Sequence, residues 1–280
     1  MKIAILGAGS LGSAIGTTNA LTGDVLLRGT DINSAYNISL ATGRTLTLDH
    51  SGSSSILSGI ISGADANLVK QGAGAMYLRG VNTYSGLTTV SAGLLELDQS
   101  GSIVTDVVNN AGFGLNKAFT MSALDVEQQM FDVLVRTPMR LMHVALPPMK
   151  QRNKGVVINV SSVAGFIAGG SYSAAKSYLT VLSESLHTEL AGTNIKISAL
   201  CPGFTRTEFH QRGRMSMKGL PSFMWLASDT LVAKAWKDAL KGEAISIPGW
   251  QYKLLVFVIQ RLPRSIVRKV GMSVRRKQRK

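Results

Sequence analysis

The stretch from residue 33 to residue 99 holds short apolar pieces separated by Gly, Ser and Asn, and it has no long helical periodicity. Alternation of apolar and polar residues over about four to eight positions is typical of half-buried strands, and Gly, Ser and Asn between such runs are typical of turns. Residues 45–49 and 93–97 show this alternation. The stretch therefore predicts strands and turns, and it supplies no helix to cover a sheet.

Two turn motifs lie inside this stretch. Residues 70–74 carry Lys-x-Gly-x-Gly, and residues 82–86 carry Asn-x-Tyr-x-Gly. The segment resembles the passenger-associated β-strand repeat of bacterial autotransporters, in which such turns join the rungs of a β-solenoid. The motifs cover one to two repeats, whereas a stable solenoid needs about three or more. We therefore expect that residues 33–100 do not fold on their own.

The N-terminus carries a different signal. Residues 2–6 predict a buried strand that leads into a Gly-x-Gly-x-x-Gly loop formed by Gly7, Gly9 and Gly12. Glycines in this pattern permit a tight turn and the close approach of a pyrophosphate to a helix N-terminus. The alternative is a glycine-rich turn that binds no ligand.

A carboxylate follows at the distance that a dinucleotide-binding unit requires. Asp31 lies 19 residues after Gly12, near where a carboxylate binds the ribose of NAD. Arg28 would instead suit the 2′-phosphate of NADP. Residues 1–32 therefore predict the βαβ start of a nucleotide-binding fold.

Tyr172 and Lys176 stand four positions apart in a stretch with helical spacing. Both side chains then lie on one face of the helix, one turn apart. A phenol with an ordinary pKa of about 10 exchanges its proton poorly at neutral pH. A cation nearby favours the phenolate and lowers that pKa. The pair therefore predicts a tyrosine that transfers a proton to or from a substrate oxygen.

Further motifs surround this pair in a fixed order. They are Asn109-Asn110-Ala111-Gly112, an apolar strand at 156–160 that ends in Ser161-Ser162, a second apolar strand at 195–200, and the loop from Pro202 to Thr207. Together they resemble the short-chain dehydrogenase/reductase family over about residues 103–280. The resemblance implies an α/β fold with a Rossmann-like, doubly wound parallel sheet, in which the β-rich solenoid-like segment replaces part of the first half.

The same resemblance implies roles for individual residues. Ser162 would hydrogen-bond the substrate oxygen, with Ser161 as the alternative, Tyr172 would act as general acid or base, and Lys176 would lower the pKa of that tyrosine and bind the nicotinamide ribose. The cofactor would be NAD or NADP. Its other expected contacts are Asn110, Gly112, Pro202, Gly203, Thr205 and Thr207, beside Gly7, Gly9, Gly12 and Asp31 of the N-terminal motif.

The chain departs from the family pattern at three places. The family's Thr-Gly-x-x-x-Gly-x-Gly loop is absent, and Ser162 precedes Tyr172 by ten residues where the family commonly has thirteen. Leu134 occupies the position at which the family carries an Asn that orders a water behind the lysine. Since a leucine side chain forms no hydrogen bonds, the proton relay behind Lys176 would lack one member.

The charge of the chain is unevenly distributed. Residues 1–100 carry a net charge of −1 and residues 101–280 a net charge of +15, and nine of the last twenty residues are Lys or Arg. The segment 252–280 alternates apolar and basic residues, with Pro263 interrupting any single helix. The charge is first of all typical of a solvated basic tail, and contact with an anionic membrane surface and packing on a partner subunit are the alternatives.

Other features limit the class of protein. The single cysteine, Cys201, excludes an intramolecular disulfide, and the four histidines have no metal-binding spacing. We therefore expect no metal, and we expect no nucleic-acid partner because no recognised binding motif accompanies the charge. We also expect no signal peptide, because the first strand leads directly into the glycine loop. The expected location is cytoplasmic, with peripheral membrane contact.

The sequence therefore predicts a mosaic of four parts, at 1–32, 33–100, 101–251 and 252–280. Such a mosaic could be a fusion, an engineered or computed sequence, or an assembly error. The leading hypothesis is an NAD(P)-dependent oxidoreductase that acts on an apolar small-molecule carbonyl or alcohol. A homo-oligomer is the expected assembly. The alternatives are a non-catalytic chimera without a complete cofactor pocket and a basic module that binds a membrane surface or a partner.

Overall fold

The computed structural model describes residues 3–6, 9–10, 21–30, 32–97, 106–115, 117–207, 220–269 and 271. The chain divides into two units. The first unit comprises Met1–Gly112, Arg136–Val157 and Thr193–Ile195, and the second comprises Phe113–Val135, Ile158–Gly192 and Lys196–Lys280.

The first unit is built on one long parallel sheet. In spatial order its strands are β1 (Ile3–Leu6), β3 (Val25–Gly29), β6 (Thr45–His50), β9 (Asn67–Gln71), β11 (Thr88–Val90) and β13 (Val107–Asn109). Paired residues in successive strands are 22, 21, 22, 20 and 19 positions apart in the sequence. The chain thus returns to the same sheet about every 20 residues, which is the period of a solenoid rung.

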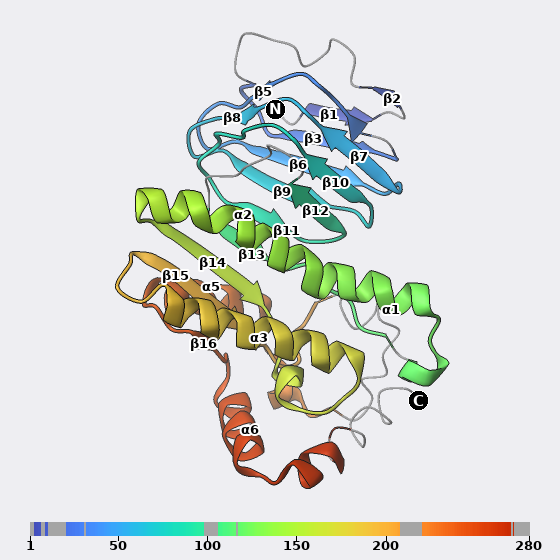
Figure 1. Cartoon of the computed structure of the whole chain (residues 1–280), viewed down its shortest axis with the longest axis vertical. Helices are drawn as coiled ribbons and strands as arrows, with labels where there is room; N and C mark the ends of the chain where they lie inside the picture. The colour runs from blue at the N-terminus through green and yellow to red at the C-terminus, as the bar shows by residue number, and fades with distance from the viewer. Residues whose placement is uncertain are drawn as a thin grey trace. The chain divides into compact units, whose positions relative to one another are not determined.

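Shorter strands form the other faces of each rung (Figure 1). They are β12 (Leu94–Leu97), β10 (Ala75–Leu78) and β7 (Ser54–Leu57) in one sheet, β2 (Gly9–Ser10) with β4 (Ile32–Asn33), and β5 (Ile38–Ser39) with β8 (Ile61–Ser62). Alternate residues of β6, β9 and β10 are buried. The predicted strands and turns are therefore confirmed, and they form a β-solenoid whose interior is filled by every second side chain.

The solenoid is longer than its motifs indicated. Strands β1 and β3, which the sequence assigned to a nucleotide-binding start, pair in the solenoid sheet. Gly9 lies in β2 and pairs with Ile32 of β4, where the sequence predicted a turn. The estimate of one to two repeats was too low, because a rung needs only alternating apolar residues, whereas the motifs mark only some of the turns.

The repeat motifs supply hydrogen bonds that connect the rungs. Lys70 is buried, and its ammonium donates to the carbonyl oxygens of Gln71, Gly72 and Ala92, of which the last belongs to the next rung. Burial lowers the Lys70 pKa to about 8. Ala92 lies 22 residues after Lys70 in the sequence, so Lys70 connects its own turn to the following rung.

The second motif acts in the same way. Asn82 is buried, accepts a hydrogen bond from the Ile61 amide at 2.9 Å and donates to the Gly80 carbonyl. The Tyr84 hydroxyl lies 2.7 Å from the Thr88 hydroxyl. The Asn of the motif therefore links residues 21 positions apart in the sequence, and the buried Tyr84 fills the solenoid interior.

The last rung of the solenoid pairs with strand β13 and is covered by helix α2 (Thr137–Arg152). Strand β13 pairs in parallel with β11, and helix α2 contacts β12 and β13. Arg140 of this helix forms an ion pair with Glu96 of β12. Because an open solenoid end exposes apolar surface and needs a cap, α2 serves as that cap in the first unit.

The second unit has an α/β architecture. Its parallel strands are β14 (Gly155–Val160, which begins in the first unit), β15 (Ile195–Leu200) and β16 (Ile245–Ser246). Its helices are α1 (Leu124–Phe131), α3 (Ser171–Glu189), α5 (Ser228–Leu240) and α6 (Trp250–Arg261), with short turns η1 (Phe119–Met121), η2 (Asp132–Arg136), η3 (Val163–Phe166) and η4 (Ser222–Met224). Nearly every residue of β14 and β15 is buried, as expected of central parallel strands. The predicted Rossmann-like fold with a solenoid-like segment in its first half is therefore confirmed.

Among the helices in the described ranges, none is long and apolar enough to cross a membrane.

We predict that Lys70→Met destabilises the solenoid. The substitution keeps a long side chain but removes the buried ammonium that donates to the carbonyl oxygens of Gln71, Gly72 and Ala92, which costs about 1–3 kcal/mol. Urea unfolding followed by circular dichroism should show a lower midpoint. The matched control is Lys154→Met at an exposed position. Equal midpoints for the two variants would contradict the proposed linking role.

Candidate active site

The three residues predicted to be catalytic lie in the second unit. Ser162 lies two residues after the end of β14 and forms the N-terminal cap of η3. Tyr172 and Lys176 lie in the first two turns of α3, which begins after Gly170. Gly170 has a φ of 100°, a conformation that favours glycine. The chain can therefore reverse sharply between η3 and the helix that carries the tyrosine.

Lys176 is held against the end of the strand. It is only 3% exposed, and its ammonium donates a 2.6 Å hydrogen bond to the Val160 carbonyl. Burial lowers the Lys176 pKa to about 8, with the neighbouring Cys201 acting weakly in the opposite direction. The Lys176 nitrogen lies 5.8 Å from the centre of the Tyr172 ring. The predicted pairing of phenol and ammonium on one helix face is thus present in the structure.

The two serines at the strand end have different surroundings. The Ser161 hydroxyl is buried, donates to the Lys176 carbonyl at 2.7 Å and lies 2.6 Å from the Thr180 hydroxyl. The Ser162 hydroxyl is only partly buried, accepts a 3.1 Å bond from the Ala164 amide and lies 3.5 Å from the Pro202 carbonyl. Ser161 therefore joins β14 to α3, and Ser162 is the serine that a substrate could reach.

A glycine brings the strand end and the helix close together. A Cβ added at Gly165 would lie 3.1 Å from backbone atoms of Lys176 and Ser177. Almost any side chain at this position of η3 would force the turn away from α3. Neither Gly165 nor Thr180 belongs to a sequence motif. Their roles depend on how η3 packs on α3, so they could not be predicted from the sequence.

An apolar cluster supports Tyr172. Its buried members are Met130, Leu134, Val135 and Ala175, and the partly buried Tyr172, Phe113 and Leu115 pack against it. Leu134 lies in the middle of η2, a π-helical turn. At this position an asparagine amide would enter an apolar cluster, whereas leucine fills it. The departure from the family pattern at Leu134 is therefore accommodated by the local packing.

The loop after β15 approaches Ser162 but is restrained by a tyrosine. The Pro202 carbonyl accepts a 3.1 Å hydrogen bond from the Val163 amide. The ring of Tyr252 lies so close to Gly203 that an added Cβ would sit 2.0 Å from it. The Tyr252 hydroxyl accepts from the Phe204 amide at 2.9 Å and donates to the Met224 carbonyl. Gly203 therefore makes room for a side chain of α6, a role that the sequence did not indicate.

The predicted threonines of this loop have different surroundings. Thr205 donates its hydroxyl to the Gly203 carbonyl at 3.2 Å, and its backbone bridges to Leu226. Thr207 is exposed.

Cys201 is fully buried, and burial raises its pKa to about 11, so its environment disfavours the thiolate that a nucleophile requires.

The remaining predicted cofactor contacts are not part of this cluster as described. Gly7, Gly12 and Asp31 lie outside the described residues. Asn110, whose amide bonds the Val90 carbonyl, and Gly112 lie in the first unit. Gly9 lies in a strand paired with β4, so the described residues include no glycine turn of the kind that the sequence predicted for a pyrophosphate.

Comparison with known proteins identifies two segments. Residues 87–217 match the family described as short chain dehydrogenase, and residues 68–97 match the passenger-associated-transport-repeat. The chain thus has one segment similar to short chain dehydrogenases and one similar to the autotransporter-type repeat, and both resemblances are confirmed.

Individual relatives cover only part of the chain. Ketoacyl reductase HetN of a Nostoc species is 31% identical over 145 residues, which are 50% of each protein. An uncharacterized oxidoreductase of Myxococcus xanthus is 29% identical over 171 residues, 60% of this chain and 65% of the relative. The chain therefore spans half to two thirds of the length of these relatives.

Solved structures agree with the fold. A 7β-hydroxysteroid dehydrogenase superposes with a TM-score of 0.54 at 20% identity, over 60% of this chain and 67% of that protein. A short-chain dehydrogenase of Sphingobium yanoikuyae in complex with NADPH gives 0.51 at 20% identity, over 63% of this chain and 84% of that protein.

We predict that Lys176 makes the stability of the protein depend on pH. Since its pKa is about 8 in the folded protein and about 10.4 in an unfolded chain, the unfolded state binds more protons between these values. The free energy of unfolding should therefore rise from pH 8 toward pH 10 through this group. Urea unfolding of Lys176→Met should lack this contribution, while the exposed control Lys237→Met keeps it. Parallel pH profiles for the wild type and Lys176→Met would refute the assignment.

Proposed function

We propose that the chain is an NAD(P)-dependent oxidoreductase of the short-chain type, acting on a carbonyl or a secondary alcohol. One observation carries the proposal: the Lys176 ammonium lies 5.8 Å from the centre of the Tyr172 ring, on a helix joined to the strand end that presents Ser162. This arrangement places a proton donor or acceptor, a cation and a hydroxyl in one small region.

Each residue has a distinct part in this proposal. Bound NAD or NADP supplies or accepts the hydride. Tyr172 transfers the proton at the substrate oxygen, and Ser162 donates a hydrogen bond to that oxygen as negative charge develops there. The Lys176 ammonium favours the phenolate form of Tyr172 by electrostatic attraction. Its pKa of about 8 also suits it to exchange a proton close to neutral pH.

The finer points of the proposal concern cofactor and substrate. Asp31 would favour NAD and Arg28 would favour NADP. Phe204 lies in the loop after β15, and its ring centre lies 6.1 Å from that of Trp225, which supports an apolar small-molecule substrate. We place the enzyme in the cytoplasm, with a homo-oligomer as its expected state.

The second candidate function is a non-catalytic chimera that keeps the tyrosine and lysine without a complete cofactor pocket. Gly9 favours this candidate, because it lies in a strand paired with β4 rather than in a phosphate-binding turn. The quenching of protein fluorescence by NADH and NADPH separates the two. Binding of either cofactor supports the enzyme, and binding of neither supports the chimera.

We predict that Tyr172→Phe lowers kcat by a factor of about 10²–10⁴, because the reacting oxygen loses its general acid or base. Cofactor binding should stay close to that of the wild type, since the ring remains in the cluster. Tyr178→Phe is the matched control, because Tyr178 lies on the same helix and is more exposed. Turnover that survives Tyr172→Phe would refute the proposed role.

We predict opposite effects of Leu134→Asn on activity and stability. The amide restores a hydrogen-bonding group at the position where the family carries Asn, so kcat should rise. The same amide enters the apolar cluster at a residue that is 1% exposed, so the free energy of unfolding should fall by about 1–3 kcal/mol. The control Leu134→Met keeps the position apolar and should raise no activity. Steady-state kinetics and urea unfolding of both variants test this, and a lower kcat in the folded Asn variant would contradict it.

A further inference from the structure

Helix α6 is apolar on both of its faces. Its inward face consists of Tyr252, Val256 and Ile259, which are buried. At 100° per residue, the opposite face carries Trp250, Leu254, Phe257 and Val258. These four side chains are exposed by 72%, 56%, 52% and 44%. We call this surface the outer face of α6.

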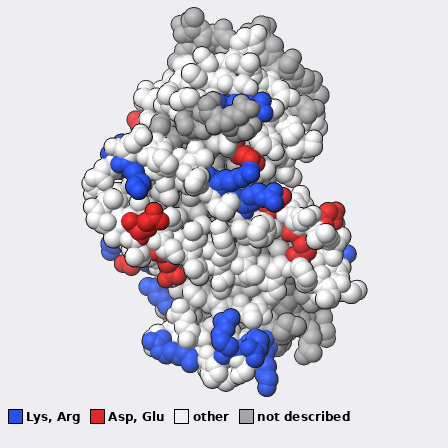
Figure 2. All heavy atoms as spheres, in the orientation of Figure 1, with Lys and Arg blue, Asp and Glu red and all other residues white. Residues whose placement is uncertain are grey.

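The outer face is surrounded by cations. Residues 250–280 contain no Asp or Glu. Lys253 and Arg261 flank the face, and the guanidinium of Arg261 lies 3.4 Å from the centre of the Phe257 ring. Arg264, Arg268 and Lys269 follow and are exposed. In Figure 2, Lys and Arg atoms gather at the end of the molecule where α6 lies, with no Asp or Glu visible among them.

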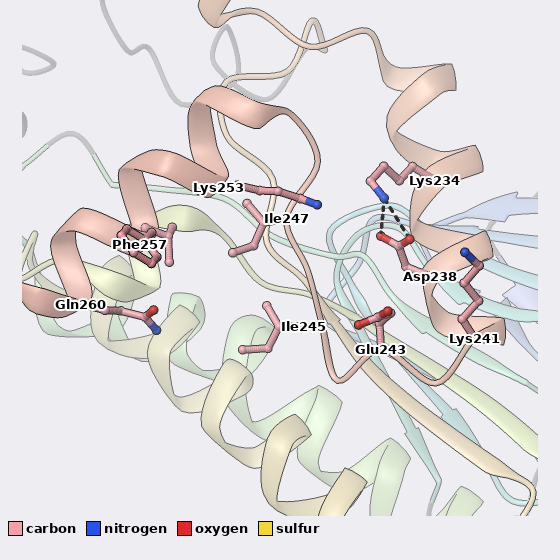
Figure 3. A pocket seen from close by; sticks show the side chains of 10 residues that line it. Lys234, Asp238, Lys241, Glu243, Ile245, Ile247, Lys253, Phe257 and Gln260 are labelled. Carbon is pink, nitrogen blue, oxygen red and sulfur yellow. Dashed lines mark hydrogen bonds and ion pairs between the residues drawn. The ribbon is translucent and has the colours of Figure 1, made fainter.

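A cleft continues this surface toward α5. Its volume is about 400 Å³, and Figure 3 shows Lys253 and Phe257 of α6 on one side and Lys234 and Lys241 on the other. Asp238 also lines the cleft, but its carboxylate is bound by Lys234 at 2.9 Å and by the Ser246 hydroxyl. Glu243 is a further acidic residue at this border. The apolar outer face thus borders a cleft in which lysines outnumber acids.

We propose that the outer face of α6 docks on the surface of a bilayer that contains anionic phospholipid. Trp, Phe and Leu on one side of a helix enter the boundary between headgroups and acyl chains, while flanking Lys and Arg bind the phosphates. Charge complementarity selects this occupant over a second copy of the chain. Two copies joined symmetrically through this face would bring the same cations together. The 12-residue helix lies along the surface, and the proposal is independent of the oxidoreductase activity.

Flotation of the full-length protein with vesicles tests the proposal. One set of vesicles contains phosphatidylcholine alone, and the other contains phosphatidylcholine and phosphatidylglycerol in a ratio of about 7:3. The protein should float with the anionic vesicles at least about tenfold more than with the neutral ones, and 0.5 M NaCl should reduce its flotation, since salt screens exposed charges. Equal flotation with both vesicles, or none with either, would overturn the proposal.

Two triple variants locate the surface. Trp250→Ser/Leu254→Ser/Phe257→Ser should lose flotation. The matched control Phe119→Ser/Met121→Ser/Leu124→Ser removes three apolar side chains that are exposed by 68%, 74% and 71%, and it should float like the wild type. Circular dichroism verifies that both variants fold. If the α6 variant still floats, or if it changes only the oligomeric state measured by light scattering, the face does not bind lipid.

Discussion

The first unit depends on the parallel pairing of β11 with β13. A strand at the edge of a parallel sheet leaves a row of amides and carbonyls unpaired, and proteins cover or pair such edges. Here the last strand of the solenoid sheet provides that pairing from Thr88 to Val90 against Val107 to Asn109. Strand β13 leads directly into Asn110 and Gly112. The last rung of the solenoid therefore has a backbone partner in a strand that leads into the Asn109-Asn110-Ala111-Gly112 motif.

Helix α2 covers the end of the solenoid with its side chains, as β13 pairs with it through its backbone. It covers the last rung of the solenoid, where Arg140 pairs with Glu96, and in sequence it leads from η2 to β14. Helix α2, which lies in the part of the chain similar to short chain dehydrogenases, thus provides the cap that a solenoid needs. Strand β13 pairs with the last strand of the solenoid sheet, and helix α2 covers the apolar surface of the last rung. This agrees with a family match that begins at residue 87 and overlaps the repeat match, which ends at residue 97.

The parts of the site that the sequence predicted are those fixed by local geometry. Tyr172 and Lys176 lie one helical turn apart, so their spacing alone brings them together. The sequence could not decide whether Ser161 or Ser162 is the better candidate for binding the substrate oxygen. That depends on which hydroxyl bonds α3, and in the structure it is the Ser161 hydroxyl that does so. Gly9 was predicted wrongly as a turn residue, because a strand of two residues has no periodicity to detect. The length of the solenoid was underestimated for a related reason, since most rungs carry no motif. Tyr252 belongs to the tail in sequence, yet it packs on Gly203.

Two buried lysines show how a structural role differs from a functional one. An ammonium has three donors. Lys70 directs all three to backbone carbonyls, and burial lowers its pKa to about 8. Lys176 is equally buried with a pKa of about 8, but within the part of the chain that the structure describes it donates only to the Val160 carbonyl. The Lys176 nitrogen also lies 5.8 Å from the centre of the Tyr172 ring, a contact with a titratable side chain that the described contacts of Lys70 do not include.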